Sequence, residues 1–250
     1  MITLFRRIRE KLIVSGSLTK YLLYAVGEIL LVMIGILLAL QVNTWNESVK
    51  NHKEELFYYD KLKENLRQDT TNLVGSMNRV DASLIVIDQI IDEFYSKENE
   101  LLDADIAFAL IRVESYSPET STWDNLKSTG KINIIQRQSV IDSLTNYYNI
   151  YLMSTKQWIE ANKDYSRNHL GPYLMKFDDI RLDFGGTSEF KDVFEPQKRS
   201  VKEYREDVFI RNALIYKRTN LTGLRSLFLN DYKRAVNILN LLDDQDPTRL

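Results

Sequence analysis

The chain contains no cysteine, only two histidines, and only nine glycines and four prolines among 250 residues. Without cysteine it can form no disulfide and offers no thiolate for catalysis or metal binding. So little glycine and proline argues against a loop-rich or β-sandwich fold and favours helices. No segment alternates polar and apolar residues with a period of two, and no motif recurs at a fixed spacing, so neither a sheet nor a solenoid is expected.

Residues suited to catalysis or metal binding are also scarce. His52 lies in a polar run and His169 precedes a Gly-Pro pair, so we interpret both as solvent-exposed or capping residues. The chain has no phosphate-binding loop and no nucleophile-elbow motif. Carboxylates at Asp178, Asp179 and Asp183 could bind calcium, but they lack the spacing of a calcium-binding loop. The sequence therefore predicts no enzyme, no cofactor, no metal site and no nucleic-acid partner.

One long apolar run dominates the chain. Tyr21–Leu40 spans twenty residues, and Glu28 is the only charged one among them. At ~1.5 Å rise per residue such a helix is ~30 Å long, which matches the hydrocarbon core of a bilayer. The run is too long for a cleaved signal peptide, and no small-residue cleavage site follows it. We therefore expect an uncleaved transmembrane helix, with the lipid bilayer as its partner.

The charges that flank this run predict its orientation. Residues 1–20 carry five basic side chains and one acidic side chain, whereas residues 44–250 carry 28 basic and 33 acidic ones. Positive charge next to a membrane span stays in the cytoplasm. We therefore expect an inner-membrane protein with three parts: a cytoplasmic amphipathic segment (1–19), a transmembrane helix (20–43) and a periplasmic domain (44–250). Apolar residues recur at three or four within residues 1–13, which indicates a helix lying in the membrane surface or, alternatively, a plain cytoplasmic leader.

Glu28 distinguishes this span from a passive anchor. A carboxylate in hydrocarbon costs several kcal/mol, so it must be protonated, paired or turned toward another helix. Gly35 and Ala39 form a small-x3-small pair that lets helices approach closely, and Gly27 lies near the same face. Gly27, Glu28, Gly35 and Ala39 thus form a predicted helix–helix contact in a homo-oligomer. Two alternatives remain open: Glu28 snorkels or pairs with Lys20, or it has a proton or ion role.

The rest of the chain shows the three- and four-residue apolar spacing of amphipathic helices. We expect an all-α fold in which the transmembrane helix continues into an antiparallel helical bundle, because apolar stripes must bury one another. Ser117-Pro118 resembles an N-cap followed by a proline at the first helical position, and Ser200-Val201-Lys202-Glu203 fits a capping box. The expected helices of the bundle cover about 56–97, 105–113, 118–129, 137–168 (or 137–177, if the helix continues past Gly171-Pro172) and 200–245, with an irregular connection at 178–199.

Aromatic residues supply two further predictions. Trp123 and Leu126 are expected to be buried, with Gly130 ending their helix at a positive φ. If they were not buried, Trp123, Leu126 and Lys127 would form a partner surface. Tyr147, Tyr148 and Tyr151 recur at helical spacing, which favours the core over a ligand pocket.

Two segments carry a resemblance to a known family. The first consists of Tyr24–Leu31, Ile34–Val42 and Asn43–Glu47, and it contains the motif Tyr-Ala-Val-Gly-Glu-Ile. The second is Thr122–Ile135, in which Thr129 stands where serine is frequent. Both are similar to an uncharacterised single-span inner-membrane family of flavobacteria and other Bacteroidota. The resemblance implies a helical periplasmic domain and carries no activity.

Two classes of function are compatible with these features. The first is a non-enzymatic structural or interaction protein of the cell envelope, self-associating and able to bind an envelope protein partner. The second is a periplasmic ligand-sensing domain that relays its signal through a partner protein. An enzyme is a distant third, because the residues for catalysis are missing.

Overall fold

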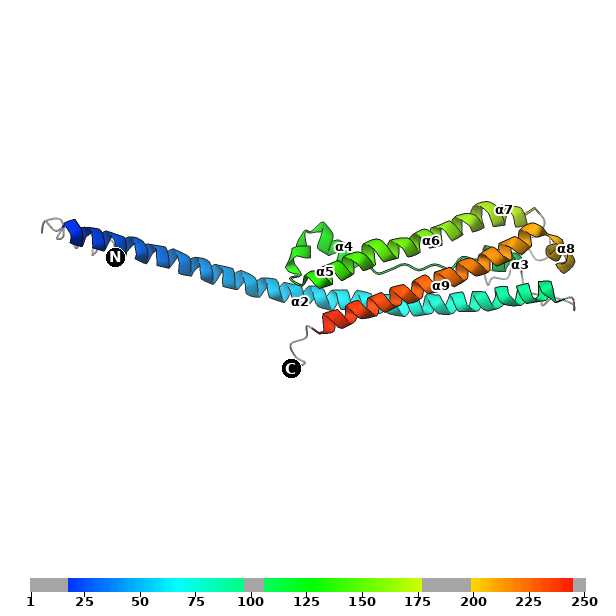
Figure 1. Cartoon of the computed structure of the whole chain (residues 1–250), viewed down its shortest axis with the longest axis horizontal. Helices are drawn as coiled ribbons and strands as arrows, with labels where there is room; N and C mark the ends of the chain where they lie inside the picture. Colours follow the sequence, from blue (N-terminus) through cyan, green and yellow to red (C-terminus); the bar gives the residue numbers. More distant parts are fainter. Residues whose placement is uncertain (1–17, 97–105, 177–198, 245–250) are drawn as a thin grey trace, which may run out of the picture. The chain divides into compact units, whose positions relative to one another are not determined.

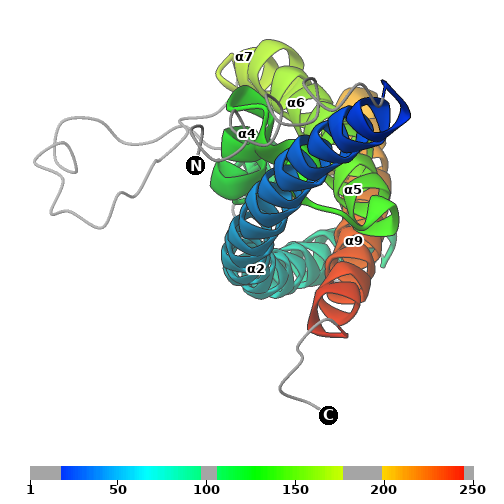
Figure 2. The same ribbon diagram turned by 90° about the vertical axis from the view of Figure 1, so that its left-hand side faces the viewer.

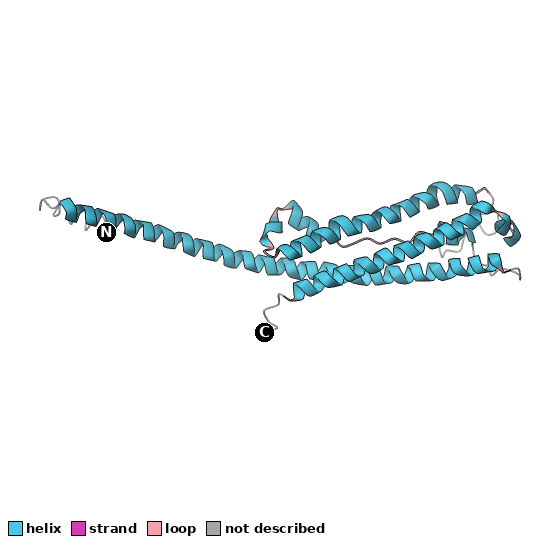
Figure 3. Cartoon of the chain, viewed as in Figure 1, coloured by secondary structure: helices cyan, strands magenta, loops and turns pink. Residues whose placement is uncertain are grey.

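The computed structural model describes residues 18–96, 106–176 and 199–244. Within these ranges every regular element is helical, as Figure 3 shows, so the all-α prediction is confirmed for them. The predictions for residues 1–13 and for the carboxylates at 178–183 lie outside the described residues. The chain divides into two compact units, Met1–Phe57 and Tyr58–Leu250, and each is described by itself.

Helix α2 covers Leu18–Tyr95 and therefore contributes to both units. Its first part is the one stretch within the described residues that is long and apolar enough to cross a membrane, and none of that stretch is buried. At ~100° per residue, Glu28, Gly35 and Ala39 lie within ~40° of one another, whereas Gly27 lies ~80° from Gly35. No atom lies within 4 Å of a Cβ added at Gly27 or Gly35, so both positions are open in the single chain. Whether a second helix binds there stays a prediction.

In the second unit, α2 pairs with α9, which covers Val208–Asp243 (Figures 1 and 2). Three ion pairs join the two helices: Lys63–Asp243 at 3.0 Å, Asp81–Arg225 at 2.5 Å and Asp88–Arg218 at 2.6 Å. From pair to pair, the residue number rises on α2 by as much as it falls on α9. The pairs therefore define one antiparallel register, although solvent-exposed pairs such as Asp81–Arg225 and Asp88–Arg218 contribute little stability by themselves.

The buried residues of α2 follow a seven-residue repeat, which is the spacing of helices packed side by side. One stripe is apolar throughout and consists of Tyr59, Leu66, Leu73, Val80, Ile87 and Phe94. The stripe three residues further on contains Leu62 and Ile90 at its ends but Asp69, Ser76 and Ser83 between them. The core face of α2 is thus polar in its middle, and this polar stripe marks the site described below.

Helix α9 shows a similar repeat, in which core residues alternate at intervals of four and three from Ile210 to Leu242. Only Lys217 and Asp231 interrupt the apolar series, and both are buried. Lys217 Nζ donates to the carbonyl oxygen of Arg112, and Asp231 accepts from Thr155 Oγ1 at 2.5 Å. Buried polar residues with matched partners favour one register over others. Val208 and Ile215, apolar residues of the same helix, lie outside this series and are exposed.

The third wall of the bundle is one helical run made of α5 (Gln138–Thr145), the π-helical turn η2 (Asn146–Tyr151), α6 (Leu152–Tyr165), the π-helical turn η3 (Ser166–Leu170) and α7 (Gly171–Leu174). The predicted long helix with an extension past Gly171 is therefore confirmed, but the two wider turns carry no sequence signal. Trp158 Nε1 donates to the carbonyl oxygen of Asn220 at 3.2 Å. A Cβ at Gly223 would lie 2.6 Å from Trp158 Cζ2, so α9 approaches α6 closely only because residue 223 is glycine.

The short helices confirm some predicted boundaries and correct others. Helix α3 (Ile106–Ile111) lies within the predicted range. Helix α4 (Ser121–Ser128) begins three residues later than the Ser117-Pro118 signal predicts. Its first turn is capped from outside, since Asn65 Oδ1 on α2 accepts from the Thr122 N–H at 3.3 Å. Gly130 has φ 69°, as predicted, and the 3-10 turn η1 (Lys131–Ile134) follows it.

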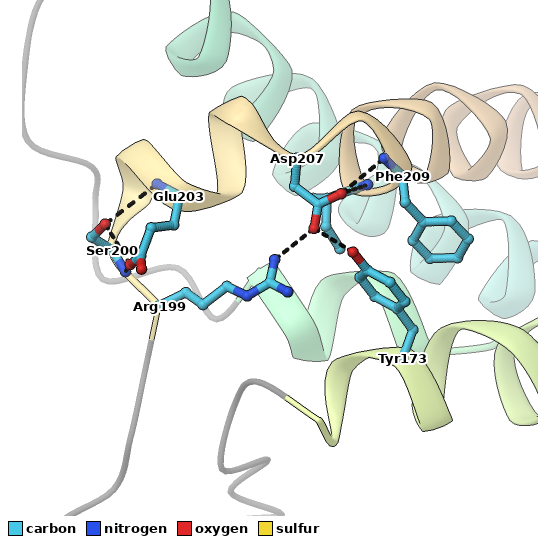
Figure 4. A network of polar contacts seen from close by, with 7 residues as sticks. Tyr173, Arg199, Ser200, Glu203, Asp207 and Phe209 are labelled. Atoms are coloured by element: carbon cyan, nitrogen blue, oxygen red, sulfur yellow. Dashed lines mark hydrogen bonds and ion pairs between the residues drawn. The ribbon is translucent and has the colours of Figure 1, made fainter.

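At the other end of the bundle, Ser200 and Glu203 form the predicted capping box of α8 (Val201–Glu206). The prediction of one uninterrupted last helix is wrong, because the helix is interrupted at Asp207. The Asp207 carboxylate accepts from the N–H groups of Phe209 and Ile210 and so caps α9 (Figure 4). When a side chain hydrogen-bonds to backbone N–H groups and so caps one helix, that hydrogen bonding competes with continuation of the preceding helix through the same residue.

Candidate functional site

The polar stripe of α2 faces the connection between α3 and α4, residues 112–120, which has no helical turn. Asp69 Oδ1 accepts from the Glu119 N–H at 2.7 Å, and Ser83 Oγ donates to Glu114 Oε1 at 2.9 Å. Arg79 Nη2 donates to Ser76 Oγ at 2.8 Å and to the carbonyl oxygen of Ser115 at 3.3 Å. The stripe therefore holds this connection along the bundle, where Figure 1 shows it as a thin green trace.

Asp69 is the most deeply buried carboxylate of the site, with 0% of its surface exposed. Its Oδ2 accepts from the Tyr147 hydroxyl at 3.1 Å. Burial raises the pKa of Asp69 from 3.8 to about 6, although the Glu119 N–H and the neighbouring Tyr116 and Tyr147 hydroxyls act in the opposite direction. The same burial raises the pKa of Tyr147, so its hydroxyl stays a donor. Asp69 therefore gains or loses its proton at a pH much closer to neutral than an ordinary aspartate does.

A group of aromatic rings packs beside Asp69. Trp123 stacks on Tyr148 with 5.7 Å between ring centroids, and Tyr147 meets Tyr148 edge-on at 4.9 Å. Trp123 Nε1 donates to Asn149 Oδ1 at 3.3 Å. The tyrosines lie in the core as predicted, with Tyr147 at 0% and Tyr148 at 8% exposure.

The predicted burial of Trp123 and Leu126 is confirmed, at 1% and 0% exposure. Their role as a partner surface, which was the alternative to burial, therefore does not fit these two side chains. Lys127 is the exposed member of the trio; its Nζ lies 5.5 Å from the centroid of a Trp123 ring and 3.1 Å from Asp124 Oδ1. A partner contact at Lys127 stays a prediction.

A second buried cluster surrounds Glu114, which is 4% exposed. Arg112 Nε lies 2.8 Å and Arg79 Nε 3.5 Å from its carboxylate. Lys217 enters from α9, and burial lowers its pKa to about 8, while Glu114 favours its charged form. The cluster sets three cationic side chains around one buried carboxylate, and neither of the two hollows described for the bundle is lined by Lys217. We therefore assign it to holding the connection in place.

A groove of about 980 Å³ opens beside the connection, between α2 and α6. Hydroxyl groups dominate its polar lining: Thr71, Ser76, Ser115, Tyr116, Ser117, Thr120, Tyr148 and Thr155. Within the described residues, the buried hydroxyl oxygen of Tyr148 has no hydrogen-bond partner, whereas the Tyr116 hydroxyl lies against Asp69 and Tyr147. Unpaired buried hydroxyls are costly, and a bound ligand is one way to satisfy them. A second hollow of about 520 Å³ shares Ser115 and Lys163 with the groove.

A further polar network closes the far end of the bundle (Figure 4). Asp207 Oδ2 accepts from the Tyr173 hydroxyl and from Arg199 Nη1, both at 2.6 Å. Burial raises the pKa of Asp207, but these donors and two backbone N–H groups outweigh burial and lower it overall. The network joins α7, α8 and α9 and is satisfied within the bundle, so it serves the fold rather than a ligand.

The histidines contribute no site. His52 and His169 are both exposed; His52 Nδ1 lies 3.6 Å from Glu55, and the His169 ring packs beside Tyr165. Within the described residues, no group of three His, Asp or Glu side chains is placed to hold a metal ion.

The described residues thus define an all-α chain that combines one helix able to cross a membrane with a helical bundle that carries a polar groove. Residues 28–169 match the model of a family described as "Family of unknown function (DUF6090)", which is more than half of the chain. The chain therefore belongs to this family. The matched range begins at Glu28 and includes Asp69, the connection and Trp123. Comparisons with curated proteins and with solved structures return no match.

Proposed function

We propose that this protein is a membrane-anchored, non-enzymatic interaction protein of the bacterial cell envelope. One observation carries the proposal: the character of α2 changes along its length. Its side chains at 29–50 are all exposed and mostly apolar up to Val42, whereas beyond Tyr58 every seventh residue is buried in the bundle. An exposed apolar surface of that length suits lipid, and the buried repeat suits a folded domain. The proposed place is the inner membrane, with the bundle in the periplasm.

The first experiment tests topology, and the absence of cysteine makes it direct. Thr222 is exposed on α9, and Thr3 lies in the basic N-terminal segment. In cells with a permeabilised outer membrane, Thr222→Cys should react with a membrane-impermeant maleimide, whereas Thr3→Cys should react only after lysis. The cysteine-free parent is the background control. Labelling of Thr3→Cys in unlysed cells together with protection of Thr222→Cys would reject the proposed orientation.

The second experiment tests self-association through the predicted contact. Single cysteines at positions 27–39 should crosslink in native membranes with maxima at 28, 35 and 39, because these positions share one face of α2. Gly35→Leu should reduce crosslinking several-fold, since it fills the close approach, whereas Glu28→Gln keeps hydrogen-bonding capacity and should preserve it. Leu37→Ala, which lies ~180° from Glu28 around α2, is the control and should leave crosslinking unchanged. Uniform or absent crosslinks would remove the oligomer.

A ligand-sensing domain is the second candidate, and the groove favours it. The unpaired Tyr148 hydroxyl lines the groove although its residue is 8% exposed, as expected for a polar group that awaits a partner. In that case the bundle would relay occupancy of the groove through a partner protein.

A further inference from the structure

Residues Val113–Pro118 behave as a strand that has no partner strand. Glu114 points inward at 4% exposure, and the Tyr116 ring meets Phe228 edge-on at 5.8 Å. Ser115, which lies between Glu114 and Tyr116, and Ser117, which follows Tyr116, are both exposed. Side chains that alternate between the core and solvent are typical of extended backbone.

The contacts with α2 confirm that the backbone of this segment is extended. The Glu114 side chain reaches Ser83, and the Glu119 N–H reaches Asp69. Those two partners are fourteen residues apart on α2, which is ~21 Å along the helix axis. The five residues of chain that lead from Glu114 to Glu119 span at most ~18 Å, so this segment must be almost fully extended. Side chains cover the rest of the ~21 Å between the two partners on α2.

The backbone of this segment is largely unpaired. Within the described residues, none of the N–H groups of Val113–Ser117 donates a hydrogen bond, and among their carbonyl oxygens only that of Ser115 accepts one, from Arg79. In a sheet these groups would pair with a neighbouring strand. An extended segment with free backbone groups is a template for a second extended chain.

The open space follows the same segment. The 980 Å³ groove is bordered by Ser115–Pro118, and the 520 Å³ hollow is bordered by Val113 and Ser115. Ser115 and Lys163 line both, so the two volumes adjoin along the segment. Together they exceed the size of ordinary small-ligand pockets, which are ~300–1,000 Å³.

The wall opposite the segment is mainly basic. Lys156, Lys163 and Arg167 line it, with Glu160 among them. Glu160 pairs with Lys163 at 2.8 Å, which leaves the charges of Lys156 and Arg167 in excess. Such a wall favours a chain with acidic side chains.

We propose that an extended acidic peptide segment of another protein binds in this groove and pairs its backbone with Val113–Ser117. The inference rests on the proposed function, because it names the class of partner that an envelope interaction protein would hold. The peptide would add hydrogen bonds along the unpaired backbone, set acidic side chains against Lys156 and Arg167, and offer an acceptor to the Tyr148 hydroxyl.

The test uses the full chain in detergent micelles and a fluorescent eight-residue peptide of alternating valine and glutamate. Anisotropy should show saturable binding, and hydrogen exchange should slow at Val113–Ser117 in the complex. The same peptide methylated on alternate backbone nitrogens should bind at least ~10-fold more weakly, because it cannot pair. A valine–lysine peptide should not bind. Absent binding, or equal binding of the methylated peptide, would overturn the proposal, and so would displacement by free glutamate at the same concentration.

Variants locate the site without disturbing the core. Ser115→Pro removes one backbone donor in an exposed extended residue and should weaken binding ~10-fold, whereas Ser115→Ala should not. Lys156→Glu with Arg167→Glu should weaken binding several-fold, and Lys233→Glu, on the exposed surface of α9, is the matched control. Equal binding by all four variants would overturn the proposal. The maleimide labelling described above is independent of peptide binding, so failure of the groove and failure of the topology are distinguishable.

Discussion

Replacing Trp123 by alanine is expected to lower the free energy of unfolding by about 3–5 kcal/mol, the usual cost of deleting a large buried aromatic side chain. The indole is 1% exposed, stacks on Tyr148 and donates to Asn149. Its removal takes away a ring that connects α4 to the η2 turn and leaves a cavity. Urea unfolding followed by circular dichroism, in the same micelles for parent and variant, measures the loss.

Trp45→Ala is the matched control, because the same substitution is made at a side chain that is 70% exposed. Its effect should stay within about 0.5 kcal/mol, as for most exposed positions. If the two variants had equal stability, the packing of α4 against the bundle would be wrong. The Trp123–Leu126–Lys127 segment would then again be a candidate partner surface.

The helices themselves follow from local chemistry and apolar spacing, which is why α3, the Ser200 capping box and the left-handed Gly130 are predictable. The start of α4 is not, because Ser117-Pro118 has the local chemistry of a helix start. The competing interaction comes from Asp69, fifty residues away, which accepts the Glu119 N–H and keeps the chain extended. A tertiary contact therefore overrides a local signal.

The polar stripe on α2 is detectable in the sequence, but only when every seventh residue is compared. Counting apolar residues at three and four finds a helix, whereas following every seventh position finds Asp69, Ser76 and Ser83 in consecutive places on its core face. At the same seven-residue spacing, Lys217 and Asp231 lie on the core face of α9. Their partners lie on other segments, so the sequence indicates that such residues need partners but not which ones.

The strand-like segment gave no usable signal. Val113, Glu114, Ser115, Tyr116 and Ser117 do not alternate in hydrophobicity, because a carboxylate occupies one of the two inward positions. That carboxylate is buried only because Arg79, Arg112 and Ser83 surround it. A groove formed by such long-range ion pairs cannot be derived from periodicity.

Asp69 makes stability depend on pH in a direction opposite to that of a salt-bridged carboxylate. Its pKa is about 6 in the folded protein and 3.8 as the ordinary value, so the folded protein binds this proton more tightly than the unfolded chain. Acidification from pH 7 to 4 therefore stabilises the fold through Asp69, by up to roughly 3 kcal/mol at ~1.4 kcal/mol per pH unit of difference. Well above pH 6, where Asp69 is fully ionised, the folded protein carries the full cost of this buried charge.

Asp69→Asn isolates this contribution. Asparagine is neutral at every pH, and its amide oxygen can still accept the Glu119 N–H while its NH₂ group faces Tyr147. The unfolding free energy of the parent minus that of the variant should therefore rise by up to roughly 3 kcal/mol as the pH falls from 7 to 4, most steeply between 6 and 4. Urea unfolding at four pH values measures it, and the subtraction cancels the other titrating groups.

Tyr147→Phe provides a second, independent test of the same carboxylate. Removing the hydroxyl takes away a donor to Asp69 Oδ2, so the pKa of Asp69 should rise above 6 and acid stabilisation should begin at a higher pH. Parallel pH profiles for the parent and Asp69→Asn would show that Asp69 is not buried as a titrating acid. Because Asp69 also holds Glu119, such a result would remove the main anchor of the connection, and the groove beside it would have to be reconsidered.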